Sequence, residues 1–480
     1  MINIRIIARV FSLVLVIEGL FMLLSALVSF IYGEHSSLIL SGIITIVTGV
    51  LVFTPLRNEE KLYGNKEGYI IVTGIWLVLS LFGTIPYLFS GTIRSFGNAF
   101  FESISGFTTT GASIFSDVES LPHGILFWRS LTQWIGGLGF IIISMSVLQV
   151  VKSINIQLTL TDFSGQATNK IHPKIKEAIK RIITIYVLLT LLESVLLMLG
   201  GMNVFDAICH SFTTMSTGGF STKNGGIASF SNPSILIILT VFMFLAGTNL
   251  TLIYFGLKRN FKKIFENNEF IFYTIICVAF ILLTSFVLIS KQGYPRGKAF
   301  LEGAFESISV ITTTGFYHTN YNLWGNFLIL IIFLMMLTGG MSGSSSGSIK
   351  SIRLLLITKN ARHEMRRLIH PNGFIPVRHD GKIIPQSIIS NLLVFITFYF
   401  LILCFGSIVI ASMGNDIITS FSTSASLLGN IGPGVGNFGP FTNFSEVPMI
   451  GKWFFSFLMF IGRLELFSVL VLFTGSFYRR

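Results

Sequence analysis

The stretch FESISGFTTTG at residues 101–111 decides the fold, because it returns almost unchanged as FESISVITTTG at residues 305–315. Each copy is a short amphipathic run that ends in three threonines and a glycine. Two further segments follow a similar pattern, so that four copies lie at residues 96–113, 203–221, 296–316 and 415–436. Four copies of one pattern predict one task that is performed four times.

The four copies share a register. Aligning their glycines also superposes one serine in each copy without gaps: Ser103 with Gly111, Ser211 with Gly219, Ser307 with Gly315, and Ser424 with Gly432. The second copy could instead be anchored on Gly218, but TGGF in copy two against TTGF in copy three favours Gly219.

The composition indicates a membrane protein. Of the 480 residues, 52% are hydrophobic and 11% are charged, and the mean hydropathy is +0.76, whereas a soluble domain has about 25% charged residues. A helix needs about 20 apolar residues to cross roughly 30 Å of hydrocarbon. Ten stretches are long enough, at about 6–31, 37–55, 69–90, 124–150, 181–200, 233–256, 269–290, 326–355, 386–412 and 448–477.

The basic residues predict the orientation of these spans. With both termini in the cytoplasm, most of the 33 Lys and Arg face inward, as the positive-inside rule requires. The exceptions are Arg94, Lys223, Lys291, Arg296, Lys298 and Lys452 in outer loops, and Arg129 and Arg463 inside spans. The net charge of +12 is therefore a topology signal, and nucleic-acid binding is not needed to explain it. The basic inner loops 152–180, 258–267 and 357–385 would contact lipid headgroups or a regulatory partner.

The four repeated segments lie between spans and are too short to cross the membrane. Irregular backbone at membrane depth persists only where protein or a water-filled cavity satisfies its polar groups. We therefore expect four re-entrant pore helices, each followed by an extended loop, around one axis. The predicted fold is an all-α polytopic membrane protein: an N-terminal two-span hairpin (1–67) and four pseudo-symmetric span, pore-helix, span repeats around one pore (68–152, 153–257, 258–356 and 357–480).

The loops that follow the pore helices suit a filter for a monovalent cation. Such a filter points carbonyl oxygens at the ion, which needs backbone angles that glycine tolerates. Threonine hydroxyls add oxygen ligands, which hard cations prefer, and the C-terminal end of a helix carries partial negative charge. The candidate filter residues are Thr109, Thr110, Gly111, Thr217, Gly218, Gly219, Thr313, Thr314, Gly315, Asn430, Ile431 and Gly432. The alternative is that these residue types only mark close helix packing.

The eighth apolar stretch is interrupted by GGMSGSSSGS at residues 339–348. Each glycine in a helix interior costs about 1 kcal/mol relative to alanine, so a continuous helix is not expected here. The hypothesis is a gate beneath the filter, formed by Gly339, Gly340, Gly343, Ser345 and Gly347; the alternative is a packing kink. The formal G-x-S-x-G match at residues 343–347 lacks the strand-to-helix turn and triad histidine of a nucleophile elbow.

Several charged residues lie in predicted membrane segments, where burying a charge costs free energy. Arg463 is near the middle of the last span, where an arginine usually faces a cavity or a partner. It would either occupy the pore below the filter or pair with Glu465 or a backbone carbonyl. Arg129 would snorkel or brace a pore helix. Glu102 and Glu306 occupy matching pore-helix positions and would either concentrate cations or brace the filter. In the inner loop 374–385, a small hairpin is predicted to turn at Asp380-Gly381.

These motifs together resemble a known family. The loops GFTTTGAS, MSTGGFST, TTTGF and GNIGPGVG, with FWRSLTQWIGGLGF (127–140), HPNGFIPVR (370–378) and GRLELFSVLVL (462–472), look like the TrkH/TrkG branch of the Trk/Ktr/HKT potassium-transporter superfamily over nearly the whole chain. The resemblance implies potassium uptake across the bacterial cytoplasmic membrane by a homodimeric, channel-like protein. It also implies a cytosolic TrkA-type RCK regulator that binds NAD or ATP, and a gating role for Arg463 and the glycine-rich stretch.

The resemblance favours potassium, because relatives that admit sodium often carry serine in the first loop, where this chain has Gly111. The alternative is a sodium-coupled or weakly selective cation channel of KtrB type. Asn430 and Ile431 stand where other loops have Thr or Gly, so the filter is not expected to be strictly symmetric. K⁺ is then the transported ion, and no organic cofactor is expected in this chain, since no Walker or Rossmann fingerprint follows a strand. An enzyme using Ser345 or the scattered histidines is the alternative of another class.

Overall fold

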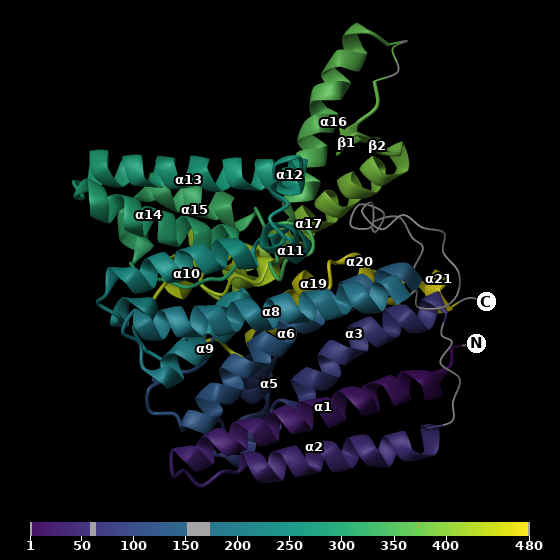
Figure 1. The fold of residues 1–480 in the computed structure, drawn as a ribbon, viewed down its shortest axis with the longest axis vertical. Helices are drawn as coiled ribbons and strands as arrows, with labels where there is room; N and C mark the ends of the chain where they lie inside the picture. The colour runs from purple at the N-terminus through teal and green to yellow at the C-terminus, as the bar shows by residue number, and fades with distance from the viewer. Residues whose placement is uncertain (1, 58–63, 151–172, 372, 374, 479–480) are drawn as a thin grey trace.

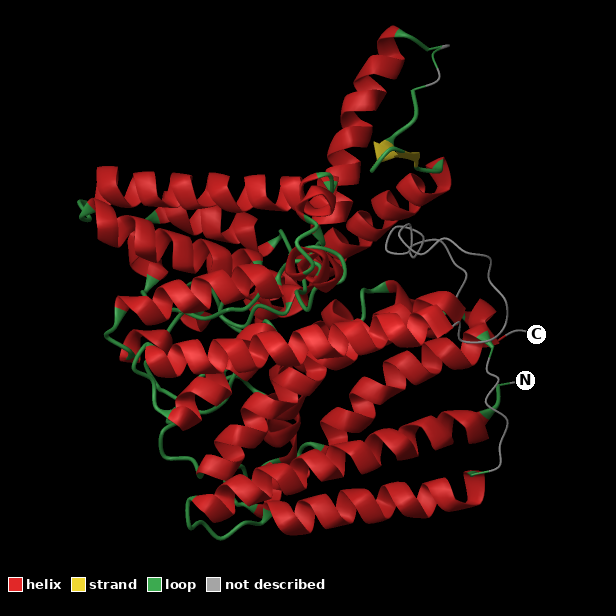
Figure 2. Ribbon diagram, viewed as in Figure 1, coloured by secondary structure: helices red, strands yellow, loops and turns green. Residues whose placement is uncertain are grey.

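The computed structural model describes residues 2–57, 64–150, 173–371, 373 and 375–478, and these are mainly helical (Figure 2). Within this part of the chain, seven helices are long and apolar enough to cross a membrane, or nine if each of two bent helix pairs is one span. The short apolar helix α15 (Asn326–Met336) belongs to the remaining predicted span. The prediction of an all-α polytopic membrane protein is confirmed.

The N-terminal hairpin consists of α1 (Ile4–Ile31) and α2 (Leu38–Phe53), which pack along each other at one edge of the molecule (Figure 1). Close approach depends on glycine, because a Cβ on Gly19 would lie 2.8 Å from the Gly42 carbonyl oxygen. Helix α1 then contacts α3 and α6, so that the hairpin flanks the first repeat.

Four units follow, each with a first span, a short pore helix and a second span. They are α3 (Asn65–Phe82), α5 (Phe96–Phe107) and α6 (His123–Val150) in repeat 1; α8 (Pro173–Leu199), α9 (Val204–Met215) and α10 (Pro233–Ala246) in repeat 2; α13 (Asn268–Gln292), α14 (Arg296–Ile311) and α15 in repeat 3; α17 (Gln386–Ser412), α18 (Ile417–Gly429) and α19 (Met449–Arg463) in repeat 4.

The four units close into a ring. Each pore helix packs against the first span of its own repeat. It also packs against the second span of the preceding repeat: α9 against α6, α14 against α10, α18 against α15, and α5 against α19. The last of these contacts joins repeat 4 to repeat 1, so that the pore helices surround one axis.

The serines that align across the repeats seat the pore helices against the first spans. The hydroxyls of Ser211 and Ser194 are 2.6 Å apart, and those of Ser307 and Thr284 are 3.2 Å apart. The Ser424 hydroxyl donates to a carbonyl of α17 at 2.9 Å, and Ser103 packs against a glycine of repeat 1. This shared serine is therefore a packing position.

Two of the predicted spans are bent helix pairs. The stretch 233–256 divides into α10 and α11 (Leu250–Leu257), and 448–477 divides into α19 and α20 (Phe467–Leu470), with a bend of 109° in each case. The Asn249 side chain caps the restarted α11, while Glu465 and Leu466 adopt left-handed backbone angles. Each bent pair still counts as one span; the bend was not predicted, because an apolar run does not record where tertiary contacts satisfy a broken backbone.

The interruption predicted in the eighth stretch is present. Residues 337–350 separate α15 from α16 (Ser351–Ile369). The predicted hairpin is also present: β1 (Arg378–His379) pairs antiparallel with β2 (Lys382–Ile383), and the turn residues Asp380 and Gly381 both have positive φ, as a type I′ turn requires.

Short elements complete the fold: α4 (Ile85–Phe89), α12 (Phe261–Phe265), α21 (Gly475–Tyr478), and the 3-10 turns Thr54–Leu56, Gly226–Ser229, Tyr321–Trp324, Gly436–Phe438 and Val471–Phe473. The basic inner loop expected at 152–180 lies largely outside the described residues.

Candidate functional site

All four chain segments leave their pore helices in the same way. In each, the residue before the aligned glycine donates its backbone N–H to a carbonyl in the last turns of the pore helix. The pairs are Thr110 to Ser105 (2.9 Å), Gly218 to Thr213 (2.8 Å), Thr314 to Ser309 (2.9 Å) and Ile431 to Ser426 (2.9 Å). The register anchored on Gly219 therefore holds in three dimensions.

The backbone angles repeat as well. The residue two positions before each glycine is left-handed, with φ of 52° at Thr109, 53° at Thr217, 58° at Thr313 and 55° at Asn430. The glycines are also left-handed, with φ of 81°, 77°, 74° and 100° in chain order. A left-handed residue other than glycine costs roughly 1–2 kcal/mol, and such strain concentrates at functional sites.

The four glycines form a closed ring of backbone contacts. A Cβ on Gly111 would lie 2.2 Å from the Gly218 oxygen, and one on Gly219 would lie 2.0 Å from the Thr314 oxygen. A Cβ on Gly315 would lie 1.7 Å from the Ile431 oxygen, and one on Gly432 would lie 2.5 Å from the Thr110 oxygen. Each loop thus presses its carbonyl against the glycine of its neighbour, and no side chain fits at any of the four positions.

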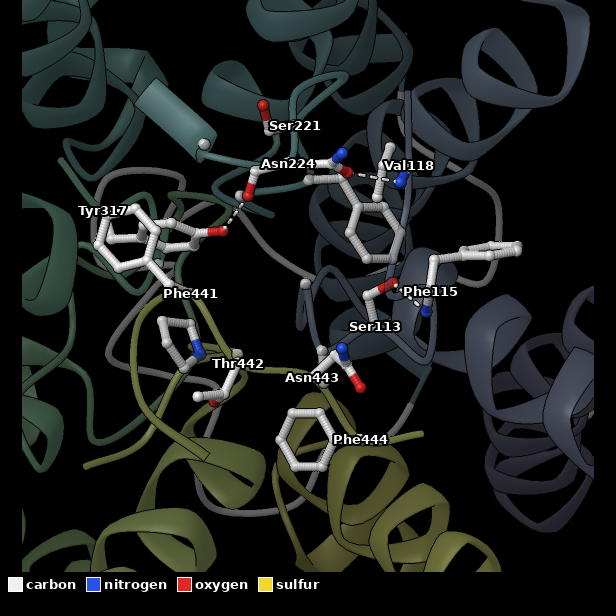
Figure 3. Close-up of a pocket in the computed structure, with 18 of the residues that line it drawn as sticks. Ser113, Phe115, Val118, Ser221, Asn224, Tyr317, Phe441, Thr442, Asn443 and Phe444 are labelled. Carbon is white, nitrogen blue, oxygen red and sulfur yellow. Dashed lines mark hydrogen bonds between the residues drawn. The ribbon is translucent and has the colours of Figure 1, made fainter. Parts of the chain in front are cut away.

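The ring opens into a cavity that all four glycines help to line. Figure 3 shows Phe115, Tyr317, Phe441 and Phe444 around this cavity. Asn224 ties the loops together at its rim, because its side-chain oxygen accepts from the Val118 N–H at 2.6 Å and its carbonyl accepts from the Tyr317 hydroxyl at 3.5 Å.

In three repeats, a residue at the matching pore-helix position holds the part of the loop that follows the aligned glycine. Glu102 accepts from the Ile114 N–H at 2.9 Å, and Glu306 accepts from the N–H groups of His318 and Thr319 at 2.8 and 2.9 Å. In the second repeat, His210 Nε2 lies 3.0 Å from the Ser221 hydroxyl. Glu102 and Glu306 are buried, so these contacts fit the bracing alternative better than a cation-attracting one.

Two residues of α6, in the first repeat, bond to the loop of the second repeat. Arg129 Nε donates to the Glu102 carboxylate at 2.6 Å and Nη1 donates to the Ser221 carbonyl at 3.0 Å, which agrees with bracing of a pore helix. Gln133 donates to the Gly218 carbonyl at 2.7 Å and accepts from the Phe220 N–H at 3.1 Å. The Gly218 oxygen is thus already engaged by an amide. Sequence reasoning missed Gln133, although an amide within an apolar span must find partners.

The 337–350 loop lies directly against the ring. The Gly347 N–H donates to the Thr313 hydroxyl at 2.7 Å, and the Thr217 hydroxyl donates to the Ser345 hydroxyl at 3.3 Å. A Cβ on Gly347 would lie 2.2 Å from the Gly429 oxygen at the end of α18. The loop therefore touches the C-terminal ends of the pore helices, or the loops that follow them, in repeats 2, 3 and 4.

The other glycines of this loop also occupy close contacts. The Gly339 N–H donates to the Ile349 carbonyl at 2.8 Å, and this bond joins the two ends of the loop. A Cβ on Gly340 would lie 2.7 Å from the Gly247 oxygen, and one on Gly343 would lie 2.8 Å from the Asn249 amide nitrogen. The break between α10 and α11 is thus what receives the 337–350 loop.

Arg463 is buried and bonds to backbone carbonyls. Its Nη1 donates to the Ser345 carbonyl at 2.7 Å, its Nη2 donates to the Gly136 carbonyl at 3.4 Å, and its guanidinium lies 4.2 Å from the Phe140 ring centroid. Glu465 pairs instead with Arg353. Arg463 therefore joins the first and fourth repeats to the 337–350 loop, and it bonds to backbone carbonyls, as one of the sequence alternatives expected, and not to Glu465.

Within the described residues, no group of three or more His, Cys, Asp and Glu is arranged to hold a metal ion. The Ser345 hydroxyl, the candidate nucleophile of the enzyme alternative, donates to the Met215 carbonyl at 3.0 Å.

The chain is similar to known proteins over nearly its whole length. Residues 34–478 match the family model described as TrkH, cation transport protein. The Trk system potassium uptake protein TrkH of Salmonella typhimurium is 33% identical over 99% of each chain, and TrkG of Escherichia coli is 30% identical over 99% of each chain. The crystal structure of the potassium transporter TrkH from Vibrio parahaemolyticus superposes with a TM-score of 0.91 at 31% identity, over 100% of both chains.

These relatives are transporters, and the enzyme alternative is set aside. The matches cover nearly the whole chain at 30–33% identity, and they confirm the family resemblance drawn from the sequence motifs. The chain belongs to the TrkH family of cation transport proteins.

Proposed function

We propose that this chain takes up potassium across the cytoplasmic membrane through a pore formed by one polypeptide. The observation that carries the proposal is the closed ring in which four loops share one backbone conformation and contact each other through glycine. Carbonyl and hydroxyl oxygens are the ligands that a bare alkali cation prefers. The relatives are named as potassium uptake proteins, which supports potassium as the ion.

The twelve residues from Thr109 to Gly111, Thr217 to Gly219, Thr313 to Gly315 and Asn430 to Gly432 form the filter in this proposal. The loops begin at the C-terminal ends of the four pore helices, whose partial negative charge favours a cation. The aromatic cavity of Figure 3 is then the outer vestibule. With both termini in the cytoplasm, the membrane potential drives entry with about 2.3 kcal/mol per charge per 100 mV.

The 337–350 loop is the gate in this proposal, and we call it the gate loop below. It lies against the filter through Thr217 and Thr313, where it would obstruct an ion leaving the ring. Arg463 places a guanidinium beside it, and a fixed positive charge near the path opposes cations.

A cytosolic regulator and a second copy complete the proposal. The relatives are named as parts of a Trk system, which supports a partner of TrkA type that binds NAD or ATP and opens the gate. Helix α16 carries basic residues on the side of the molecule where the first helix begins and the last one ends (Figure 1), and this helix is where we place the partner. We also propose that the protein is a homodimer.

Flux of ⁸⁶Rb⁺ into proteoliposomes that contain the purified full chain tests this function. We expect uptake that K⁺ inhibits and Na⁺ does not, and a larger flux when residues 343–347 are deleted. Equal inhibition by Na⁺ would favour the weakly selective alternative, and uptake that requires Na⁺ would favour the sodium-coupled one. If neither the wild-type chain nor the deletion variant carried flux above that of empty liposomes, the proposed pore would be wrong.

A further inference from the structure

A buried carboxylate clasps the gate loop from its own repeat. Glu269 lies in the first turn of α13 and is 4% exposed. One of its carboxylate oxygens accepts from the Ser342 N–H at 2.6 Å, and the other accepts from the Ser342 hydroxyl at 3.0 Å. Ser342 lies in the gate loop between Gly340 and Gly343. Both oxygens of one ionisable group are thus committed to one gate-loop residue.

The hairpin turn holds the residues next to this carboxylate. One oxygen of Asp380 accepts from the Asn268 backbone N–H at 3.0 Å and from its side-chain amide at 2.8 Å. The other accepts from the Asn267 amide at 3.1 Å. Asn267 in turn caps α13 by accepting from the Phe270 N–H at 2.8 Å. The tip of the β1–β2 hairpin therefore fixes the start of α13, immediately before Glu269.

The body of the hairpin is attached to α16. Val377 and Ile384 flank the two strands and pack in one apolar cluster with Ile352, Leu355 and Leu356 of α16, together with other residues of α16, α17 and α13. The Lys359 ammonium also donates to the Arg378 carbonyl at 3.1 Å. Helix α16 begins at Ser351, directly after the gate loop. The hairpin therefore contacts both the helix that follows the gate loop and the start of α13, which carries Glu269.

We propose that Glu269 and Asp380 form a latch that keeps the gate loop against the filter, and that displacement of the hairpin releases it. The inference rests on the gating role proposed above and names the residues that would couple it to the cytoplasmic surface. Hydrogen bonds to a carboxylate are the strong class, and a buried carboxylate that loses its donors is costly. Moving Asp380 would shift Asn267 and Asn268, and Glu269 with them. A partner opens the gate this way only if it binds the displaced hairpin more tightly than the seated one.

The test uses the full chain in proteoliposomes without a regulator. Glu269→Gln removes the charge from the clasp, and we expect ⁸⁶Rb⁺ flux to rise about tenfold or more. Ser342→Ala removes only the hydroxyl donor and should give a smaller increase. Asp380→Ala should raise flux as well, and combining it with Glu269→Gln should add little, because both act on one path. The matched control is Glu266→Gln, whose exposed side chain lies 3.7 Å from the Lys262 ammonium, and its flux should equal that of the wild type.

Selectivity separates a released latch from a damaged filter. If the role of Glu269 were merely structural, a rise in flux would come with a loss of preference for K⁺ over Na⁺; release of the latch should leave this preference unchanged. Wild-type flux in Glu269→Gln, while deletion of 343–347 raises flux, would overturn the latch and leave the gate intact. If the deletion of 343–347 also left flux unchanged, the proposed gating role of this loop would be wrong. Additive effects of Glu269→Gln and Asp380→Ala would overturn the link between hairpin and clasp. Should Glu269→Gln fail to fold, Ser342→Ala and Asp380→Ala still decide the question.

Discussion

Replacing Gly315 by alanine should block the pore or abolish its selectivity while leaving the protein folded. Gly315 has a φ of 74°, so the added side chain costs roughly 1–2 kcal/mol in backbone strain. The larger effect is steric, because the new Cβ would lie 1.7 Å from the Ile431 oxygen. The two atoms would have to separate by more than about 1 Å, whereas a functional site tolerates displacements of about 0.5 Å.

Gly293 provides the matched control. It has a similar φ of 67°, at the C-terminal end of α13, but a Cβ added there would meet nothing within 4 Å. Gly293→Ala therefore pays the backbone strain alone, and we expect it to lower stability by about 1 kcal/mol with wild-type flux.

The assay compares ⁸⁶Rb⁺ flux in proteoliposomes with the thermal stability of the detergent-purified protein. Gly315→Ala should lose at least about tenfold in flux, which corresponds to about 1.4 kcal/mol, or should lose its preference for K⁺ over Na⁺. If Gly315→Ala and Gly293→Ala behaved alike, with normal flux and selectivity, the contact ring would not be the filter.

Three further predictions concern charged residues. Arg463→Ala should raise flux severalfold in the regulator-free protein, because it removes the guanidinium beside the gate loop; loss of folding without any gain would instead mark a purely structural arginine. Arg129→Leu should lower the melting temperature strongly, since leaving Glu102 buried without its partner costs about 3–5 kcal/mol; a change within experimental error would contradict the bracing role. Burial alone would raise the pKa of Glu34, in the loop between α1 and α2, but hydrogen bonds from His123 outweigh it and lower that pKa. Its stabilising contribution should therefore be present above about pH 4.3 and be lost as the pH falls through the lower folded-state pKa. Glu34→Gln should flatten the dependence of the free energy of unfolding on pH in that range.

Sequence patterns captured the repeated parts of the protein well. The register of the four loops, the interruption at 339–348 and the turn at Asp380-Gly381 all follow from short-range rules: glycine where φ must be positive, and a broken helix where glycines are dense. The broken helices at 247–249 and 464–466 did not follow, because each lies within a long, mainly apolar stretch. The clasp of Ser342 by Glu269 was also missed, since it joins residues far apart in the chain.

By itself, the amino-acid sequence determined the membrane environment, the four-part organisation and the positions at which only glycine is tolerated. These depend on hydropathy and on backbone angles, which are local properties. The tertiary structure alone decided which carbonyl presses on which glycine, that Arg463 bonds to the Ser345 carbonyl while Glu465 pairs with Arg353, and that the break after α10 receives the 337–350 loop. Such pairings depend on how four helical units close into a ring, and in a low-dielectric interior each polar group accepts whichever partner that closure brings within reach.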